Sequence, residues 1–175
     1  MMTTDRRHVM VAAITGGYLI YDGIILFCYV KSFDALGLQT LIHHFIGTSG
    51  LFIGVMAGWG TPSIGNMSVM SEISTIFLNY RSMFGKEQMQ EVLPQINQVI
   101  FFITYTIFRM FLYPYGTYIL IKIQYYGWPY TTQFKKNCLW VTIVEYLAMF
   151  ALNVYWYKLI VVGLLKMIGI MESKP

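Results

Sequence analysis

Two short stretches of the 175-residue sequence place ionisable side chains inside otherwise apolar segments: LIHHFIGTSG at residues 41–50 and SEISTIFLNYR at residues 71–81. His43, His44 and Glu72 are the groups concerned. If these segments cross a bilayer, each ionisable group costs about 2.5–3.5 kcal/mol near mid-depth and is expected to face a partner or a cavity. The meaning of both stretches therefore depends on whether the chain lies in a membrane.

The composition is that of a membrane protein. Apolar residues make up 57% of the chain and charged residues 11%, whereas a typical soluble domain has about 45–50% and about 25%. The mean hydropathy is +0.56. The net charge of +4 is scattered along the chain without a basic stripe or a nucleic-acid motif, so no nucleic-acid partner is expected.

The two cysteines, Cys28 and Cys138, each lie in or beside an apolar segment. Isolated thiols in such places usually act as small apolar side chains. No Cys/His spacing typical of a metal site occurs in the sequence. We expect neither a metal nor a cofactor, although a bound phospholipid fits such a chain.

Five segments approach the length of about 20 largely apolar residues that a membrane span needs: residues 9–30, 35–57, 67–84, 94–126 and 138–168. Irregular backbone cannot face lipid, so all five are expected to be helices. The sequence predicts an all-α, polytopic transmembrane bundle of about five spans, in a single domain covering residues 1–175. Pro114 is expected to kink the long fourth span or to mark where it leaves the bilayer.

The intramembrane polar residues are expected to converge in one layer. A helix rises about 1.5 Å per residue, which places Asp22 and His43 at similar depths on neighbouring antiparallel helices, where they can meet. Arg109 is expected to pair with Glu72 or Glu145. The predicted layer comprises Tyr18, Asp22, His43, His44, Glu72, Thr75, Asn79, Arg109 and Glu145.

Helical spacing supports this layer. Glu72, Thr75 and Asn79 are spaced i, i+3, i+7, which puts them on one helix face. A second stripe, in which His43 is followed by Gly47, Gly50 and Gly54, predicts close approach by another helix.

Two interpretations of the layer compete. In the first, its ion pairs are internal contacts that neutralise buried charge and fix which helices are neighbours. In the second, it lines a polar chamber where a histidine acts as a base or nucleophile on an acyl group. The catalytic candidates would then be His43, His44, Asp22 and Glu72.

Four pieces of the sequence together resemble the TLC domain family: GYLIYD at residues 17–22, the pair His43-His44, EISTIFLNYR at residues 72–81 and FFITYTIFR at residues 101–109. This helical membrane domain is shared by ceramide synthases, translocation-associated membrane proteins and several proteins of lipid homeostasis. The resemblance covers about residues 15 to 112 in the family's order. It implies a TLC-like bundle with its polar layer at these motifs.

Two departures from the family pattern bear on function. Ceramide synthases follow the histidine pair with two aspartates three residues apart, and the matching positions here are Glu72 and Thr75. Acyl transfer from acyl-CoA to a sphingoid amine would lack part of the apparatus that the resemblance implies. Family members also usually have one or two more helices before the first span. We therefore expect a domain trimmed at its N-terminal side, with a flank that faces lipid or a partner.

The favoured hypothesis is a non-catalytic TLC-fold protein, an accessory subunit that packs against membrane lipids and other subunits of a larger complex. The mitochondrial inner membrane is the expected location. The alternative is a lipid-metabolising or lipid-sensing protein of the endoplasmic reticulum type. In that case His43 or His44 is the base or acyl acceptor, Asp22 or Glu72 orients it, and Arg109 holds a head group. A channel or transporter is a weaker third hypothesis, because discontinuous helices are not indicated.

Overall fold

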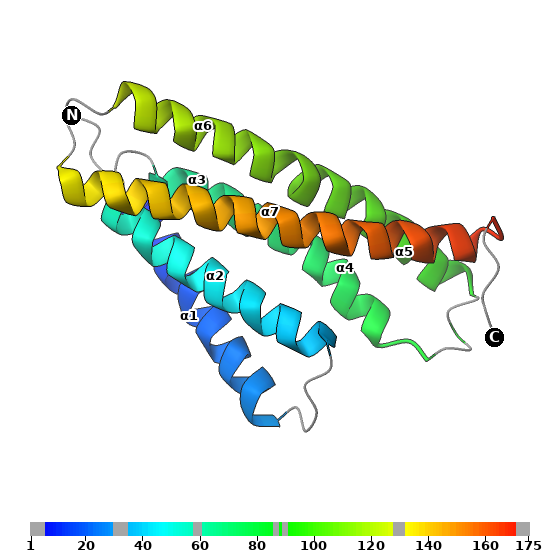
Figure 1. Cartoon of the computed structure of the whole chain (residues 1–175). Coiled ribbons are helices and arrows are strands. Elements are labelled where there is room, and N and C mark those ends of the chain that lie inside the picture. The colour runs from blue at the N-terminus through cyan, green and yellow to red at the C-terminus, as the bar shows by residue number, and fades with distance from the viewer. Residues whose placement is uncertain are drawn as a thin grey trace.

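The computed structural model describes residues 6–29, 35–57, 61–85, 88, 91–127 and 132–170, and this part of the chain is helical throughout apart from short turns. Figure 1 shows the arrangement. The elements are α1 (Arg6–Tyr29), α2 (Ala35–Ala57), α3 (Thr61–Val69), the 3₁₀ turn η1 (Met70–Glu72), α4 (Ile73–Ser82), α5 (Val92–Tyr105), the π-helical segment η3 (Thr106–Phe111), α6 (Leu112–Tyr126) and α7 (Gln133–Met167). The predicted all-α fold is confirmed.

Four helical stretches of the described residues are long and apolar enough to cross a membrane: Arg6–Cys28, Gly37–Ala57, Val92–Tyr126 and Gln133–Met167. They correspond to the predicted segments 9–30, 35–57, 94–126 and 138–168. The predicted third segment, residues 67–84, is not one such helix. It consists of the end of α3, then η1 and α4, because the polar groups of SEISTIFLNYR interrupt its apolar character. The prediction that the whole chain is one domain stays a prediction.

Helix α7 runs along the length of the bundle and packs against α2, α5 and α6. Helix α3 passes behind α7 in Figure 1, and α4 extends below α7 and packs against α5. Helix α1 packs against α2 and α3. The α1–α2 pair diverges from α6 and α7 toward its lower end in this view (Figure 1). The polar residues of α2, η1, α4 and η3 therefore meet inside the bundle, where α7 passes them.

The main apolar core lies between α3, α6 and α7, and its buried members include Ile64, Tyr113, Leu120 and Tyr146. A Cβ on Gly116 would lie 2.7 Å from Tyr146 Cε1, so a glycine is required for this approach of α6 to α7. The Tyr146 hydroxyl in turn donates a hydrogen bond of 2.6 Å to the backbone oxygen of Ile64. Packing and hydrogen bonding thus fix the three helices together.

The glycine stripe of α2 meets three different helices instead of one. Cβ atoms built at Gly47, Gly50 and Gly54 would lie 3.2–3.5 Å from Leu19 of α1, Glu145 of α7 and Thr61 of α3, respectively. The expected close approach exists, but at His43 it does not come from a single neighbour. Small residues on α2 allow it to sit centrally among three helices.

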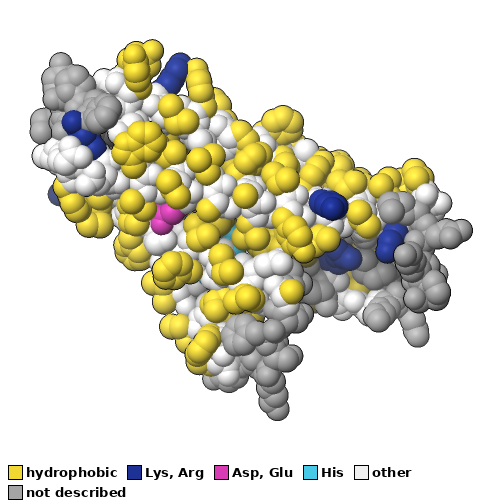
Figure 2. All heavy atoms as spheres, viewed as in Figure 1, with side chains coloured by type: hydrophobic (Ala, Val, Ile, Leu, Met, Phe, Trp, Pro, Cys, Tyr) yellow, Lys and Arg dark blue, Asp and Glu magenta, His cyan; other side chains and the backbone are white. Residues whose placement is uncertain are grey.

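The outer surface is apolar. Large hydrophobic side chains are exposed on α1, α2, α5, α6 and α7, as in a bundle whose solvent is lipid. Figure 2 shows hydrophobic side chains over most of the visible face, with Lys and Arg gathered toward the two ends of the molecule. This distribution suits a membrane span with its basic residues near the interfaces.

The long fourth span changes its winding just before Pro114. Residues 106–111 form a π-helical segment, after which α6 continues to Tyr126. Proline lacks the N–H that would bond the carbonyl four residues earlier, and its ring clashes with that carbonyl, so a local change of winding relieves the conflict. The helix does not end at Pro114, and the wider turn carries Arg109.

Candidate functional site

Glu72, at the end of η1, is the centre of a polar cluster inside the bundle. Its Oε2 accepts a hydrogen bond of 2.7 Å from Thr75 Oγ1. Its Oε1 lies 3.3 Å from Arg109 Nη2 and 3.5 Å from His43 Nε2. The spacing of Glu72 and Thr75, one turn apart on a helix face, lets both groups meet the same guanidinium. Of the two acids expected as partners of Arg109, the structure places Glu72 beside it.

Arg109 is 4% exposed, and its guanidinium is nearly saturated with acceptors. Besides Glu72, Nε donates to Ser74 Oγ at 3.0 Å, Nη1 to Asn153 Oδ1 at 3.2 Å, and Nη2 to Thr75 Oγ1 at 3.0 Å. A guanidinium has five N–H donors, and these contacts satisfy most of them. The cation joins η1, α4, η3 and α7.

Sequence reasoning missed three members of this cluster: Ser74, Tyr105 and Asn153. Asn153 is fully buried, and the Tyr105 hydroxyl lies 3.1 Å from its backbone oxygen and 3.2 Å from its Oδ1. The Arg109 guanidinium also lies 5.3 Å from the centre of the Tyr105 ring, a cation–π distance. An asparagine in the middle of the apolar segment 138–168 was the available signal for this site.

The two histidines have different carboxylate partners. His44 Nε2 lies 3.5 Å from Asp22 Oδ2 of α1, whereas His43 faces Glu72. Asp22 does pair with a histidine of α2, but the partner is His44 and not His43, whose depth it shares. With 3.6 residues per turn, consecutive side chains on a helix point about 100° apart, so depth alone does not decide which of the two reaches α1.

Glu145 lies at a separate site. Its Oε1 accepts a hydrogen bond of 2.7 Å from Ser49 Oγ, and its buried Oε2 has no hydrogen-bond partner among the described residues. Glu145 precedes Asn153 by eight residues, or about 12 Å along α7. The structure does not bring it to Arg109, so the expected single layer divides into separate contacts.

Tyr18 and Asn79 line an open groove between α1 and α4. The groove has a volume of about 350 Å³ and is also lined by Glu72 and Thr75. Both Tyr18 and Asn79 are exposed. The predicted face of Glu72, Thr75 and Asn79 therefore borders this groove.

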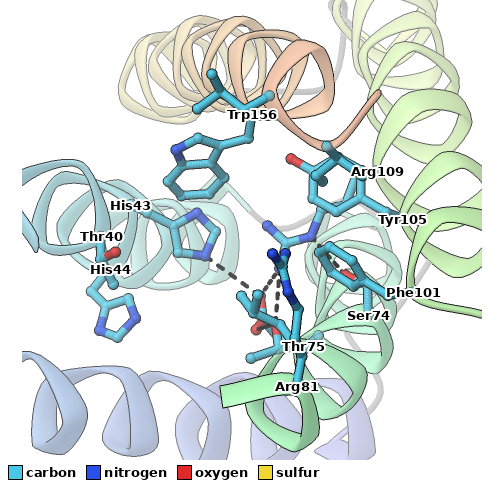
Figure 3. Close-up of a pocket in the computed structure, with 14 residues that line it drawn as sticks. Thr40, His43, His44, Ser74, Thr75, Arg81, Phe101, Tyr105, Arg109 and Trp156 are labelled. Carbon is cyan, nitrogen blue, oxygen red and sulfur yellow. Dashed lines mark hydrogen bonds and ion pairs between the residues drawn. The ribbon is translucent and has the colours of Figure 1, made fainter. Parts of the chain in front are cut away.

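A second hollow, of about 250 Å³, lies on the other side of the Glu72–Thr75 pair. We call it the His43 cavity. Figure 3 shows His43, Trp156, Arg109, Thr75 and Arg81 around it. Trp156 Nε1 donates to Gln39 Oε1 at 2.7 Å, and its ring centre lies 5.5 Å from that of His43. The remaining wall is largely apolar: Leu78, Phe101, Leu159 and Ile160.

The unpaired ring nitrogens define what chemistry this arrangement could support. Nδ1 of both His43 and His44 is buried and has no hydrogen-bond partner among the described residues. A histidine oriented through one nitrogen by a carboxylate, with the other nitrogen free, has the geometry of a general base. Three or more His, Cys, Asp or Glu placed to hold a metal ion are not found in the part of the chain that the structure describes.

A bundle of long apolar helices around buried charged groups defines an integral membrane protein. A family model described as the TLC domain matches residues 1–162, and the chain belongs to this family. The resemblance inferred from the four motifs is thereby confirmed. The search of curated proteins and the search of solved structures returned no match.

Proposed function

We propose that this protein is a non-catalytic TLC-fold subunit of a larger membrane complex, which packs against partner helices and lipids. The observation that carries the proposal is the closed network around Arg109. Its guanidinium is bound by Glu72, Ser74, Thr75 and Asn153. The cation that would hold a head group under the alternative hypothesis is thus committed to internal contacts.

The acid that could assist catalysis is committed as well. Glu72 is shared among Arg109, Thr75 and His43, and the hydroxyl of Thr75 occupies the place of a second carboxylate in the family pattern. A cluster of this kind stabilises the relative positions of the helices, because breaking it would leave a charge buried without a partner.

The flank formed by α1 supports the assembly part of the proposal. Among the described helices, α1 packs substantially against only α2 and α3. Several of its large apolar side chains are exposed: Ile14, Tyr21, Ile24 and Phe27. This face is suited to partner helices as well as to lipid. We propose the mitochondrial inner membrane as its location.

Site-specific photocrosslinking tests the proposal. A photoreactive residue at Ile14 or Tyr21 should give discrete protein adducts in the native membrane, whereas one at the buried Ala12, on the same helix, should not. If the outward positions label only lipid and the protein migrates alone after solubilisation in mild detergent, the subunit proposal fails.

A lipid-metabolising or lipid-sensing role is the second candidate, and one observation favours it. His43 faces Glu72 through Nε2, while its Nδ1 is unpaired beside a cavity of about 250 Å³. An acyl-CoA transfer assay together with lipid analysis tests this role. Changed lipids in His43→Ala or His44→Ala would support it, and unchanged lipids in both variants would eliminate it.

A further inference from the structure

We infer that the His43 cavity binds an anionic membrane lipid, with the acidic head group on Arg81 and part of an acyl chain inside the cavity. This inference goes beyond the proposed subunit function and holds or fails independently of it. Its starting point is the position of Arg81, in the last turn of α4, where Figure 3 shows the side chain extending toward the polar cluster.

Arg81 differs from Arg109 in its partners. Arg109 is bound on several sides, whereas Arg81 forms no ion pair with a carboxylate of the described chain. Both arginines line the cavity, and Glu72 is the acid that lines it with them. Asp22 is held at His44 and does not line the cavity. The two arginines and the one acid leave the lining with one positive charge in excess.

An uncompensated cation beside an apolar cavity favours an anionic ligand. Basic pockets between membrane helices recognise acidic lipid head groups for this reason. Arg81 lies at the end of α4, next to the polar sequence GKEQMQE at residues 85–91. The backbone of Arg81 is therefore near the end of an apolar segment, where head groups are expected to meet water.

The rest of the cavity suits a hydrocarbon chain. Leu78, Phe101, Leu159 and Ile160 form its apolar wall. Leu78 is 44% exposed and Leu159 is 50% exposed, so the cavity opens onto the apolar outer surface between α4 and α7. Its volume of about 250 Å³ is about eight times the share of one water molecule in the liquid. A ligand can thus enter from the lipid phase and keep its head group at Arg81.

Fluorescence quenching by brominated lipids tests this inference, because Trp156 lines the same cavity. The full chain is reconstituted in vesicles of phosphatidylcholine that contain either brominated phosphatidylglycerol or brominated phosphatidylcholine. The chain has four tryptophans, so the signal of Trp156 is obtained by subtracting that of the Trp156→Phe variant. We expect the anionic lipid to occupy the site about fivefold more readily than the neutral one, the preference of one basic group at a membrane surface.

The preference should disappear in Arg81→Gln and remain in Arg81→Lys. Lys158→Gln is the matched control: Lys158 is exposed on α7 two residues from Trp156 and does not line the cavity. It should keep the preference. Monodisperse elution of each variant in detergent shows that it is folded. If Arg81→Gln does not fold, Arg81→Lys still tests whether a positive charge at this position gives the preference.

Three results would overturn the inference. One is equal quenching of Trp156 by both lipids in the unaltered protein. Another is a loss of preference in Lys158→Gln as large as in Arg81→Gln, which would indicate general surface attraction. The third is removal of the preference by excess inorganic phosphate, which would show that a free anion suffices without the acyl chain.

Discussion

Arg109 Nη2 lies 3.3 Å from Glu72 Oε1 although 37 residues separate them in the chain. This pair joins the π-helical segment of the fourth span to the 3₁₀ turn between α3 and α4. Both elements depart from regular α-helix at the residues that carry the charges. Regular helices would present these side chains in other directions. The 3₁₀ turn and the π-helical segment therefore orient Glu72 and Arg109 toward each other.

Replacing Arg109 by Ala should strongly destabilise the fold. The change orphans Glu72 together with its neighbours Ser74 and Asn153, and the free energy of unfolding should fall by about 3–5 kcal/mol, the cost of breaking a buried pair. Asp22→Ala should cost less, because it leaves only His44 without its partner. Thermal unfolding in detergent measures both, with the exposed Lys166 replaced by Ala as the control. Equal melting temperatures for the three variants would contradict the network.

Arg109 and Asn153 should be energetically coupled. Asn153 Oδ1 accepts from Arg109 and also lies within hydrogen-bond distance of the Tyr105 hydroxyl. A double-mutant cycle with Arg109→Ala and Asn153→Ala should give an interaction energy of about 0.5–3 kcal/mol. Additive effects of the two substitutions would show that the contact contributes little. Lys122→Ala combined with Asn153→Ala is a suitable additive control, since Lys122 contacts Tyr118 on α6.

Neutralising Glu145 and neutralising Glu72 should have different effects on the free energy of unfolding. Glu145→Gln keeps an acceptor for Ser49 and removes an ionisable group whose second oxygen is buried without a partner. Its free energy of unfolding should stay the same or rise, because an ionisable group inside the bilayer is costly. Glu72→Gln removes the counter-charge of Arg109 and should lower the free energy of unfolding. Parallel melting curves give the order of the two variants, and the reverse order would refute this account.

Gly116→Ala should destabilise the packing of α6 on α7. The added Cβ would lie 2.7 Å from Tyr146 Cε1, and Tyr146 is itself fixed by its bond to Ile64. Overpacking of this kind costs about 1–3 kcal/mol. Gly17→Ala is the matched control, because nothing lies within 4 Å of a Cβ there. It should stabilise its helix by up to about 1 kcal/mol. Chemical unfolding of both variants shows whether their changes in the free energy of unfolding have opposite signs.

The sequence was sufficient for the fold class and for most helix positions, because apolar length and composition are local properties. It located Glu72, Thr75 and Arg109 at a common site, since helical rise gives the depth of each residue. It did not identify the correct histidine for Asp22. That choice depends on the rotation of α2 about its axis, which is set by the packing of Gly47 and Gly50 against α1 and α7.

The remaining differences also arise from long-range packing. Nothing in the sequence distinguishes Ser74 from the other small polar residues of its helix, and the buried Asn153 has no evident partner there. Both join the site because η3 brings Arg109 between them. Glu145 lies eight residues before Asn153, or about 12 Å along α7, which is too far for it to join the Arg109 cluster. Its partner is Ser49 of α2, a contact that depends on how α2 and α7 pack.

The π-helical segment at residues 106–111 has a consequence for how this protein can change during evolution. A π turn accommodates roughly one more residue than an α turn, so deleting Ile107 would rewind the span and swing Arg109 away from Glu72 without altering either side chain. Insertions and deletions here should be selected against as strongly as loss of the arginine itself. The number of residues in this turn should therefore be as constrained as the identity of Arg109.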